Sequence, residues 1–317
     1  MTDRRYSHQR CVLAALSITA LISGCMSGES CGNQPQQSAV ESDTTIVLTF
    51  DDGPIPADIA MPSVDPDPEV LLAPMRQILS KLERANAQAV FYIKGPGDDV
   101  AAQKLLCVFG EALRVIHEAG HVFGYHTFHH DRQIWVEPLA PLVQAEAKMS
   151  NDLDRLEAFV EQALAPEALQ ARDVFSPIFR QPYGGAGIDQ TPAILAAWQR
   201  GWVYHGYRID SGDWTGNADA NPRIVVRLPV DDDAQHIEFV RQQLSAGAAR
   251  NADRAAADVL FHINALTAIH LDEWIEELNS ACMATTGHLP TYSVPECYLQ
   301  RSDAFIDVSV LGALGQR

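Results

Sequence analysis

Short apolar runs alternate with longer segments of helical period along most of the chain. The apolar runs predict strands over 45–50, 88–94, 121–125, 176–180, 202–208 and 257–262. The amphipathic segments predict helices over 69–86, 101–119, 139–164, 191–200, 234–248 and 268–281. Strands that alternate with helices are typical of a parallel sheet that is closed or curled by outer helices. The sequence therefore predicts an α/β fold.

The amino-terminal residues have the layout of a bacterial secretory signal, with three arginines followed by an apolar stretch at 11–22. That stretch is too short to span a membrane stably. The ending Leu21-Ile22-Ser23-Gly24-Cys25 resembles a lipobox, which implies that Cys25 receives a lipid and becomes the mature amino terminus. An ordinary cleaved signal peptide is the alternative.

These features divide the chain into three parts. We expect a lipoprotein signal peptide over 1–24, a flexible tether rich in Ser, Gly, Gln and Asn over 25–43, and one large domain over 44–317. The remaining residues are enough for a single α/β barrel. With Met26 after the lipidated cysteine, an outer membrane facing the periplasm is favoured over the inner membrane.

The chain is strongly acidic, with a formal net charge of −18. Removing residues 1–24 takes away three arginines and Asp3, so the charge becomes −20. Nucleic acid and anionic lipid surfaces are therefore poor partners. A neutral or cationic polymer, such as chitin, chitosan or a peptidoglycan glycan, is more compatible with this charge.

The six cysteines do not form a zinc-thiolate pattern, because the chain has no Cys-x-x-Cys. Export permits disulfides. Cys282 and Cys297 flank a loop with Gly, Pro and Thr, and we expect them to form a disulfide. We expect Cys107 to be a buried free thiol in a helix.

Two adjacent carboxylates, Asp51 and Asp52, follow the first apolar run. Neighbouring carboxylates repel each other, so two free anions at neutral pH need a cation that neutralises one of them. A metal ion is the obvious candidate. The alternative is a simple turn, because Asp, Gly53 and Pro54 are all turn residues.

Two histidines four residues apart, His126 and His130, follow the third predicted strand. Together with either Asp51 or Asp52 they make a three-ligand set that leaves positions open for water, as a catalytic metal site requires. The spacing alone leaves His121 and His129 as competing ligands.

Three further predicted strands also end in polar residues. Arg180 can hold a carboxylate by two hydrogen bonds, Asp210-Ser211-Gly212-Asp213-Trp214 follows the next strand, and His262 ends the last. Because the carboxyl ends of parallel strands meet at one edge, we expect all these side chains to gather at a single site.

These segments resemble, in order, the five motifs of the NodB-like polysaccharide deacetylases, carbohydrate esterase family 4. The motifs are Thr49-Phe50-Asp51-Asp52-Gly53-Pro54, His126-Thr127-x-x-His130, Arg180-x-Pro182-Tyr183, Asp210-Ser211-x-Asp213-Trp214 and Leu260-x-His262. The resemblance covers roughly residues 44–282 and implies a distorted (β/α)7 barrel. It leaves 283–317 as a divergent carboxyl-terminal extension of the catalytic domain.

The resemblance also implies a role for each motif residue. A divalent metal, most often zinc, is bound by Asp52, His126 and His130. Asp51 is the base, Arg180 holds it ionised, His262 protonates the departing amine, and Asp213 orients His262. The backbone N–H of Tyr183 binds the oxyanion, and Trp214 and Leu260 line a small pocket for the acetyl methyl group.

The expected function is metal-dependent removal of N-acetyl groups from an aminosugar polysaccharide of peptidoglycan or chitin type by a cell-envelope lipoprotein. An O-acetyl esterase acting on a glycan such as acetylxylan, and a catalytically silent glycan-binding lipoprotein, are the alternatives. A serine hydrolase is disfavoured, because the G-x-S-x-G match at 28–32 lies in the tether and not between a strand and a helix. Asp231-Asp232-Asp233 is interpreted as an acidic helix start.

Overall fold

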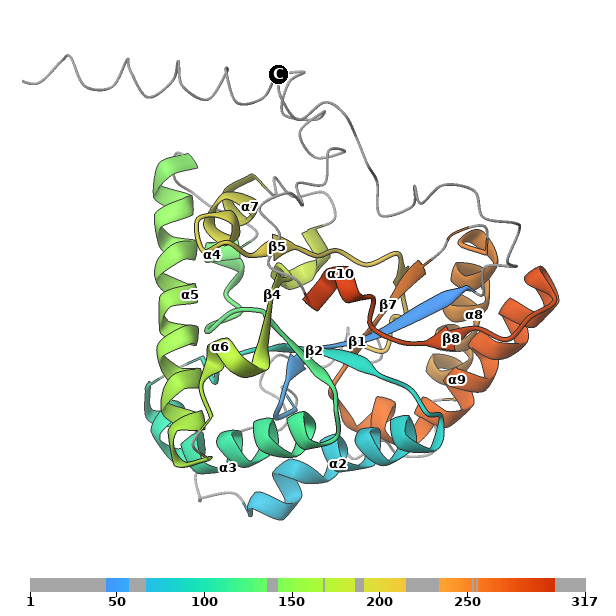
Figure 1. Ribbon diagram of the computed structural model, residues 1–317, viewed down its shortest axis with the longest axis horizontal. Coiled ribbons are helices and arrows are strands. Elements are labelled where there is room, and N and C mark those ends of the chain that lie inside the picture. The colour runs from blue at the N-terminus through green and yellow to red at the C-terminus, as the bar shows by residue number, and fades with distance from the viewer. Residues whose placement is uncertain are drawn as a thin grey trace, which may run out of the picture. The chain divides into compact units, whose positions relative to one another are not determined.

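A sheet of parallel strands lies at the centre of the computed structural model, which describes residues 44–56, 67–97, 99–135, 142–167, 169–185, 191–214, 234–252, 254 and 256–299 (Figure 1). The strands are β1 (Thr45–Gly53), β2 (Ala89–Ile93), β3 (Val122–Tyr125), β4 (Phe175–Phe179), β5 (Val203–Tyr204), β6 (Ile209–Asp210), β7 (Ala256–His262) and β8 (Thr291–Tyr292). Seven of them follow the order β5-β4-β3-β2-β1-β7-β6, and β8 pairs with the start of β1.

The sheet is curled, because its two end strands are joined by only four residues. β5 pairs with β4 and β6 pairs with β7, yet residues 205–208 alone connect them. A link this short spans at most about 18 Å. The distorted (β/α)7 barrel expected from the sequence is therefore confirmed, with seven parallel strands in the curled path.

The prediction of a single strand over 202–208 is wrong. Within that range the structure has only the short strand β5, because the chain leaves β4 after Tyr204 and joins β7 at Ile209, where β6 begins. Residues 205–208 cross between the two ends of the sheet, and the strand-forming residues Trp202, Val203 and Tyr204 before them and Ile209 after them gave the segment the appearance of a continuous strand.

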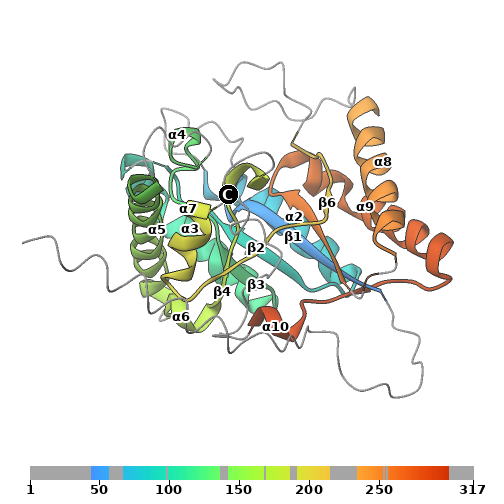
Figure 2. The same cartoon turned by 90° about the horizontal axis from the view of Figure 1, so that it is seen from above.

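Six longer helices surround the strands, as the sequence pattern predicts. They are α2 (Pro68–Arg84), α3 (Asp99–Glu118), α5 (Leu142–Leu164), α7 (Thr191–Trp198), α8 (Ala234–Arg250) and α9 (Ala265–Thr286). Figure 2 shows α8 and α9 on the side of β6 and α5 on the side of β3 and β4. Short elements complete the described chain: α4 (Arg132–Trp135), α6 (Ala171–Val174), α10 (Glu296–Leu299) and 3-10 turns at Ala165–Glu167 and Pro182–Gly185.

Helix α9 is longer at both ends than predicted, because local caps set its limits. The side chain of Asn264 accepts a hydrogen bond from the backbone N–H of Thr267 at the start. The helix ends where Gly287 adopts the left-handed conformation, with φ of 80°.

Alternate residues of the strands face two different environments. In β1, Ile46, Leu48 and Phe50 belong to the large hydrophobic core between strands and helices. Val47 belongs to a smaller cluster on the other face, which is the inner side of the curled sheet, and Thr49 and Asp51 follow it at the same period. β7 repeats this arrangement, so that Asp258, Leu260 and His262 alternate with core residues. The strand period thus directs polar groups to the inner side.

The carboxyl-terminal segment packs against the inner cluster. Val294 joins that cluster, and the backbone of Tyr292 accepts a hydrogen bond from the N–H of Gln88. The hydroxyl of Tyr298 in α10 donates to Asp258 at 2.9 Å. The part of the predicted extension that the structure describes is therefore built into the domain.

The predicted disulfide of Cys282 is wrong, and the prediction of Cys107 as a free thiol in a helix is right except for its burial. Cys282 is a buried free thiol in the core at the end of α9, and not half of a disulfide. Cys107 lies in a helix as expected but is exposed, because it falls on the outward face of α3. The side chain of Cys297 lies outside the described part of the structure.

Several sequence predictions fall on residues that the structure does not describe. These are the signal peptide, the tether with Cys25 and the G-x-S-x-G match, and the three aspartates at 231–233. Within the described residues, none of the helices has the length and apolar character needed to cross a membrane.

Candidate active site

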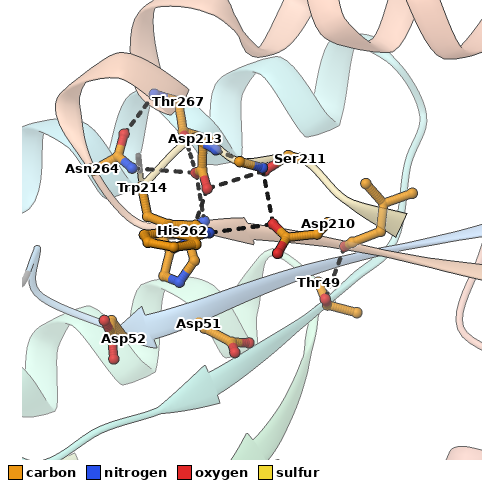
Figure 3. Close-up of polar contacts among 12 residues, drawn as sticks. Thr49, Asp51, Asp52, Asp210, Ser211, Asp213, Trp214, His262, Asn264 and Thr267 are labelled. Atoms are coloured by element: carbon orange, nitrogen blue, oxygen red, sulfur yellow. Dashed lines mark hydrogen bonds and ion pairs between the residues drawn. The ribbon is translucent and has the colours of Figure 1, made fainter. Parts of the chain in front are cut away.

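The predicted site residues come together at the carboxyl ends of the strands. Asp51 and His262 are direct register partners on the neighbouring strands β1 and β7. The backbone N–H of Arg180, just after β4, donates to Tyr125 at the end of β3, directly before His126. Figure 3 shows the imidazole of His262 directed toward the side of β1 that carries Asp51 and Asp52. With Asp213, which follows β6 and bonds to His262, five strand ends contribute to one site.

Asp52, His126 and His130 form a cluster with the composition of a metal site. The Nε2 atoms of His126 and His130 lie 3.6 Å and 3.4 Å from Oδ1 of Asp52. Among the described residues, this is the group of three potential ligands whose donor atoms all lie within 4.8 Å of one another. Asp52 and His130 both adopt positive φ, 62° and 52°. Such strained backbone persists where the surrounding structure fixes it, which is common at functional sites.

The protonation of the cluster suits a cation. The Nδ1–H of His126 donates to the carbonyl of Arg180 at 2.6 Å, so the lone pair of Nε2 is directed at Asp52. Burial lowers the pKa of His126, and it lowers the pKa of His130 to about 3, so both rings are neutral at pH 7. Burial by itself raises the pKa of Asp52, but the neighbouring His130, Lys94 and His126 outweigh it and hold the pKa well below its usual range.

The residues present fit a divalent metal. Oδ1 of Asp52 is buried and accepts no hydrogen bond from the described residues, which is costly for an anionic oxygen. Ligands of a tetrahedral ion at about 2.0–2.1 Å lie roughly 3.3 Å apart, close to the separations seen here. An ion between these three groups would therefore satisfy Asp52.

The two competing histidines are occupied elsewhere. The Nδ1 of His121, at the opposite end of β3, accepts the N–H of Ala89 at 3.3 Å. The Nδ1 of His129 contacts Asp152, and its Nε2 accepts from Arg155 at 2.9 Å. Of these two neighbouring residues, His130 therefore belongs to the metal-ligand cluster, whereas His129 has a structural role.

The other carboxylate of the pair, Asp51, is held by Arg180. Asp51 is 4% exposed and Arg180 is 1% exposed. Nη1 of Arg180 donates to Oδ1 of Asp51 at 2.9 Å and to Oγ1 of Thr49 at 2.6 Å, and Nη2 donates to the carbonyl of Gly206 at 2.8 Å. The guanidinium also lies over the ring of Tyr92, 4.2 Å from its centroid. The two aspartates therefore have separate partners.

His262 is paired with the fully buried carboxylate of Asp213 (Figure 3). Nδ1 of His262 donates to Oδ1 of Asp213 at 2.8 Å, and the backbone N–H of His262 donates to Oδ2 at 2.7 Å. Burial favours a lower pKa for His262, but Asp213 outweighs it and raises the pKa to about 9. The ring of His262 is therefore in the positively charged imidazolium form at neutral pH.

Sequence reasoning missed the residues that support this pair. Oγ1 of Thr267 donates to Asp213 at 2.6 Å, and Nδ2 of Asn264 donates at 3.2 Å. The sequence could have indicated Asn264, because this residue precedes an apolar helical segment and so predicts a helix start close to His262. Lys94 was also missed, and its Nζ lies 3.6 Å from Oδ1 of Asp52.

The three remaining predicted residues lie around the same centre. Tyr183 is 40% exposed, with φ of 61°, and its hydroxyl donates to the carbonyl of His130 at 2.8 Å. Trp214 is 57% exposed, and its indole N–H donates to Asp210 at 3.3 Å (Figure 3). Leu260 is buried two positions before His262 on β7.

A family model described as polysaccharide deacetylase matches residues 39–197, which include the first three motifs. The chain belongs to this family. The family assignment is independent of Asp213 and His262, because both lie beyond the matched residues.

Individual relatives of this member of the polysaccharide deacetylase family have low sequence identity to it. A chitin disaccharide deacetylase of Vibrio alginolyticus is 29% identical over 147 residues, which are 44% of this chain and 27% of that protein. The chain thus spans about a quarter of the length of the curated relative that it matches.

Solved structures share the fold at low identity. A chitin deacetylase from the fungus Colletotrichum lindemuthianum is 15% identical, with a TM-score of 0.50, covering 83% of this chain and 93% of that one. A family 4 carbohydrate esterase pseudoenzyme of Bacillus anthracis is also 15% identical, with a TM-score of 0.49, covering 81% of this chain and 66% of that one.

Proposed function

We propose that this protein hydrolyses N-acetyl groups of an aminosugar polysaccharide of chitin or peptidoglycan type in a metal-dependent reaction. The observation that carries the proposal is the juxtaposition of a metal-ligand cluster (Asp52, His126, His130) with a separately held carboxylate, Asp51, and a protonated imidazole, His262. Membership of the family and the chitin disaccharide deacetylase relative support the substrate class.

The metal is proposed to be zinc, held by Asp52, His126 and His130, since two imidazoles and a carboxylate are ligands that zinc accepts. When bound, a divalent ion supplies a Lewis acid that polarises the acetyl carbonyl and lowers the pKa of water toward ~7.

The base in this proposal is Asp51. Arg180 fixes its carboxylate by the 2.9 Å hydrogen bond and itself cannot accept a proton at neutral pH. Asp51 accepts the proton of the attacking water, and its position next to Asp52 in the chain brings base and metal ligand to one place. The backbone N–H of Tyr183 donates to the developing oxyanion.

The acid in this proposal is His262. Asp213 accepts from Nδ1 of the ring, so the proton on Nε2 is the one available for transfer. That proton goes to the leaving amine nitrogen when the carbon–nitrogen bond breaks. Trp214, with most of its ring exposed, and the buried Leu260 border the position of the acetyl methyl group.

The proposed location is the bacterial cell envelope, with the protein anchored by a lipid on Cys25. The support comes from the sequence at 21–25 and the acidic net charge of −18, which suits a glycan substrate better than nucleic acid.

Variants separate the proposed roles. Asp51→Asn should retain zinc and lose acetate release, whereas His126→Ala should lose zinc, because only the second removes a ligand. Zinc content and acetate release are measured on chitin oligomers, peptidoglycan and acetylxylan. If Asp51→Asn lost the ion while Asp52→Asn kept it, the two aspartates would have the opposite roles. Acetate release from acetylxylan alone would mean that the substrate is an O-acetyl ester and not an N-acetyl amide.

A further inference from the structure

We infer that Asp152, in helix α5, positions the loop that carries His126 and His130, and that it thereby sets the metal affinity of the site. The inference rests on the proposed metal-binding role of these two histidines. Asp152 is only 2% exposed and is 22 residues beyond His130 in the chain, and no motif includes it.

The carboxylate of Asp152 receives four hydrogen bonds, all from the segment that follows β3. Oδ2 accepts the backbone N–H of Phe128 at 3.0 Å and the indole N–H of Trp135 at 3.2 Å. Oδ1 accepts the backbone N–H of His129 at 3.2 Å and also contacts Nδ1 of the His129 ring. Phe128 and His129 lie between the two metal ligands, so Asp152 fixes the backbone that spaces those ligands.

The loop needs such an anchor because its last residue is in an unfavourable backbone conformation. His130 has φ of 52°, which costs free energy unless the surroundings hold it. The N–H of His130 donates to Oγ1 of Thr127 at 3.2 Å, and the carbonyl of His130 accepts from the hydroxyl of Tyr183. These contacts fix the end of the loop, whereas Asp152 fixes its middle.

The position requires a carboxylate and not a neutral amide. Both oxygens of Asp152 accept two hydrogen bonds each, and an asparagine would turn an N–H₂ group toward two of the donors. The His129 ring is held from its other side by Arg155, whose guanidinium donates to Nε2 at 2.9 Å and lies over the ring of Phe128. The nearby cation compensates the buried anion.

A role limited to stability and a positioning role predict different results. Loss of a stabilising contact lowers the melting temperature and leaves the affinity of the folded protein for zinc unchanged. Loss of a positioning contact weakens zinc binding itself, and groups behind metal ligands typically contribute about 10- to 100-fold to affinity.

The test compares Asp152→Asn with Asp154→Asn in the full chain. Asp154 lies on the same helix, and its side chain is 65% exposed in an ion pair with Arg200, so it is a matched control. Zinc dissociation constants are measured by competition with a chelator, and melting temperatures are measured on the metal-free proteins. We expect Asp152→Asn to bind zinc about 10- to 100-fold more weakly, and Asp154→Asn to bind as the unmodified protein does.

The outcomes separate this inference from the proposed function. If the unmodified protein binds zinc tightly and Asp152→Asn binds it equally well, the inference is wrong and the proposed function stands. If the unmodified protein binds no zinc, both are wrong. Should Asp152→Asn fail to fold, His129→Phe decides, because it keeps an aromatic ring beside Phe128 and removes the ring contact to Asp152. Weaker zinc binding by His129→Phe supports the inference, and unchanged binding overturns it.

Discussion

Replacing Asp213 by asparagine removes the charge that keeps His262 protonated and retains the shape of the side chain. The pKa of His262 is raised from 6.5 to about 9 in the folded protein, with burial acting against Asp213. At about 1.4 kcal/mol per pKa unit, this corresponds to roughly 3 kcal/mol in favour of the imidazolium. In Asp213→Asn, burial still lowers the pKa of His262, but the carboxylate that mainly opposes this effect is gone. We therefore expect the pKa of His262 to fall below 7.

The same substitution should change how the free energy of unfolding depends on pH. A group whose folded-state pKa is raised stabilises the fold fully below its unfolded pKa, here 6.5, and this contribution is lost as pH rises through about 9. The difference in unfolding free energy between the unmodified protein and Asp213→Asn should therefore be roughly 3 kcal/mol larger at pH 6 than at pH 9.5.

Two assays on the metal-free proteins check this reasoning. NMR titration of the His262 ring gives its pKa, and urea unfolding at the two pH values gives the free energies. Asp210→Asn is the control, because Asp210 bonds to Gly212 and Trp214 and not to the His262 ring. A His262 pKa that stays near 9 in Asp213→Asn, or a stability difference independent of pH, would refute the assignment.

Three further substitutions give independent checks. Lys94→Met should tighten zinc binding by about tenfold in a chelator competition, because an ammonium 3.6 Å from Oδ1 of Asp52 repels a cation there; weaker binding would contradict this. Arg180→Lys should lower the unfolding free energy by about 3 kcal/mol and abolish most acetate release while zinc content is unchanged, because one ammonium cannot replace a planar guanidinium; turnover near the original would contradict this. Tyr298→Phe should cost about 1 kcal/mol in urea unfolding through loss of its hydrogen bond to Asp258, and an unchanged midpoint would mean that this hydrogen bond does not stabilise the domain.

Residues at strand ends were predictable because parallel strands place their carboxyl ends at one edge. Asp51, Arg180 and His262 each follow an apolar run, so the strand pattern alone assigns them to one site. The alternation of β1 also explains why Asp51, and not Phe50, faces the inner side of the sheet.

Other features depend on contacts between distant segments and leave little trace in the sequence. The spacing of the histidines did not separate His129 from His130, because the difference is set by Asp152, which lies on helix α5 and not in the loop that carries them. The exchange of strand partners at 205–208 depends on pairing with β4 and β7. The free thiol of Cys282 follows from its direction into the core, which residue spacing in the loop does not specify.

In the proposed mechanism, Asp52, His126 and His130 hold a metal that deacetylation requires. The most direct measurement is acetate release from N-acetylglucosamine oligomers by the same preparation before chelation, after chelation and after zinc is restored. We expect release with one new amine per acetate, loss of release on chelation, and recovery with zinc. Release that continues unchanged after complete removal of metal would contradict it.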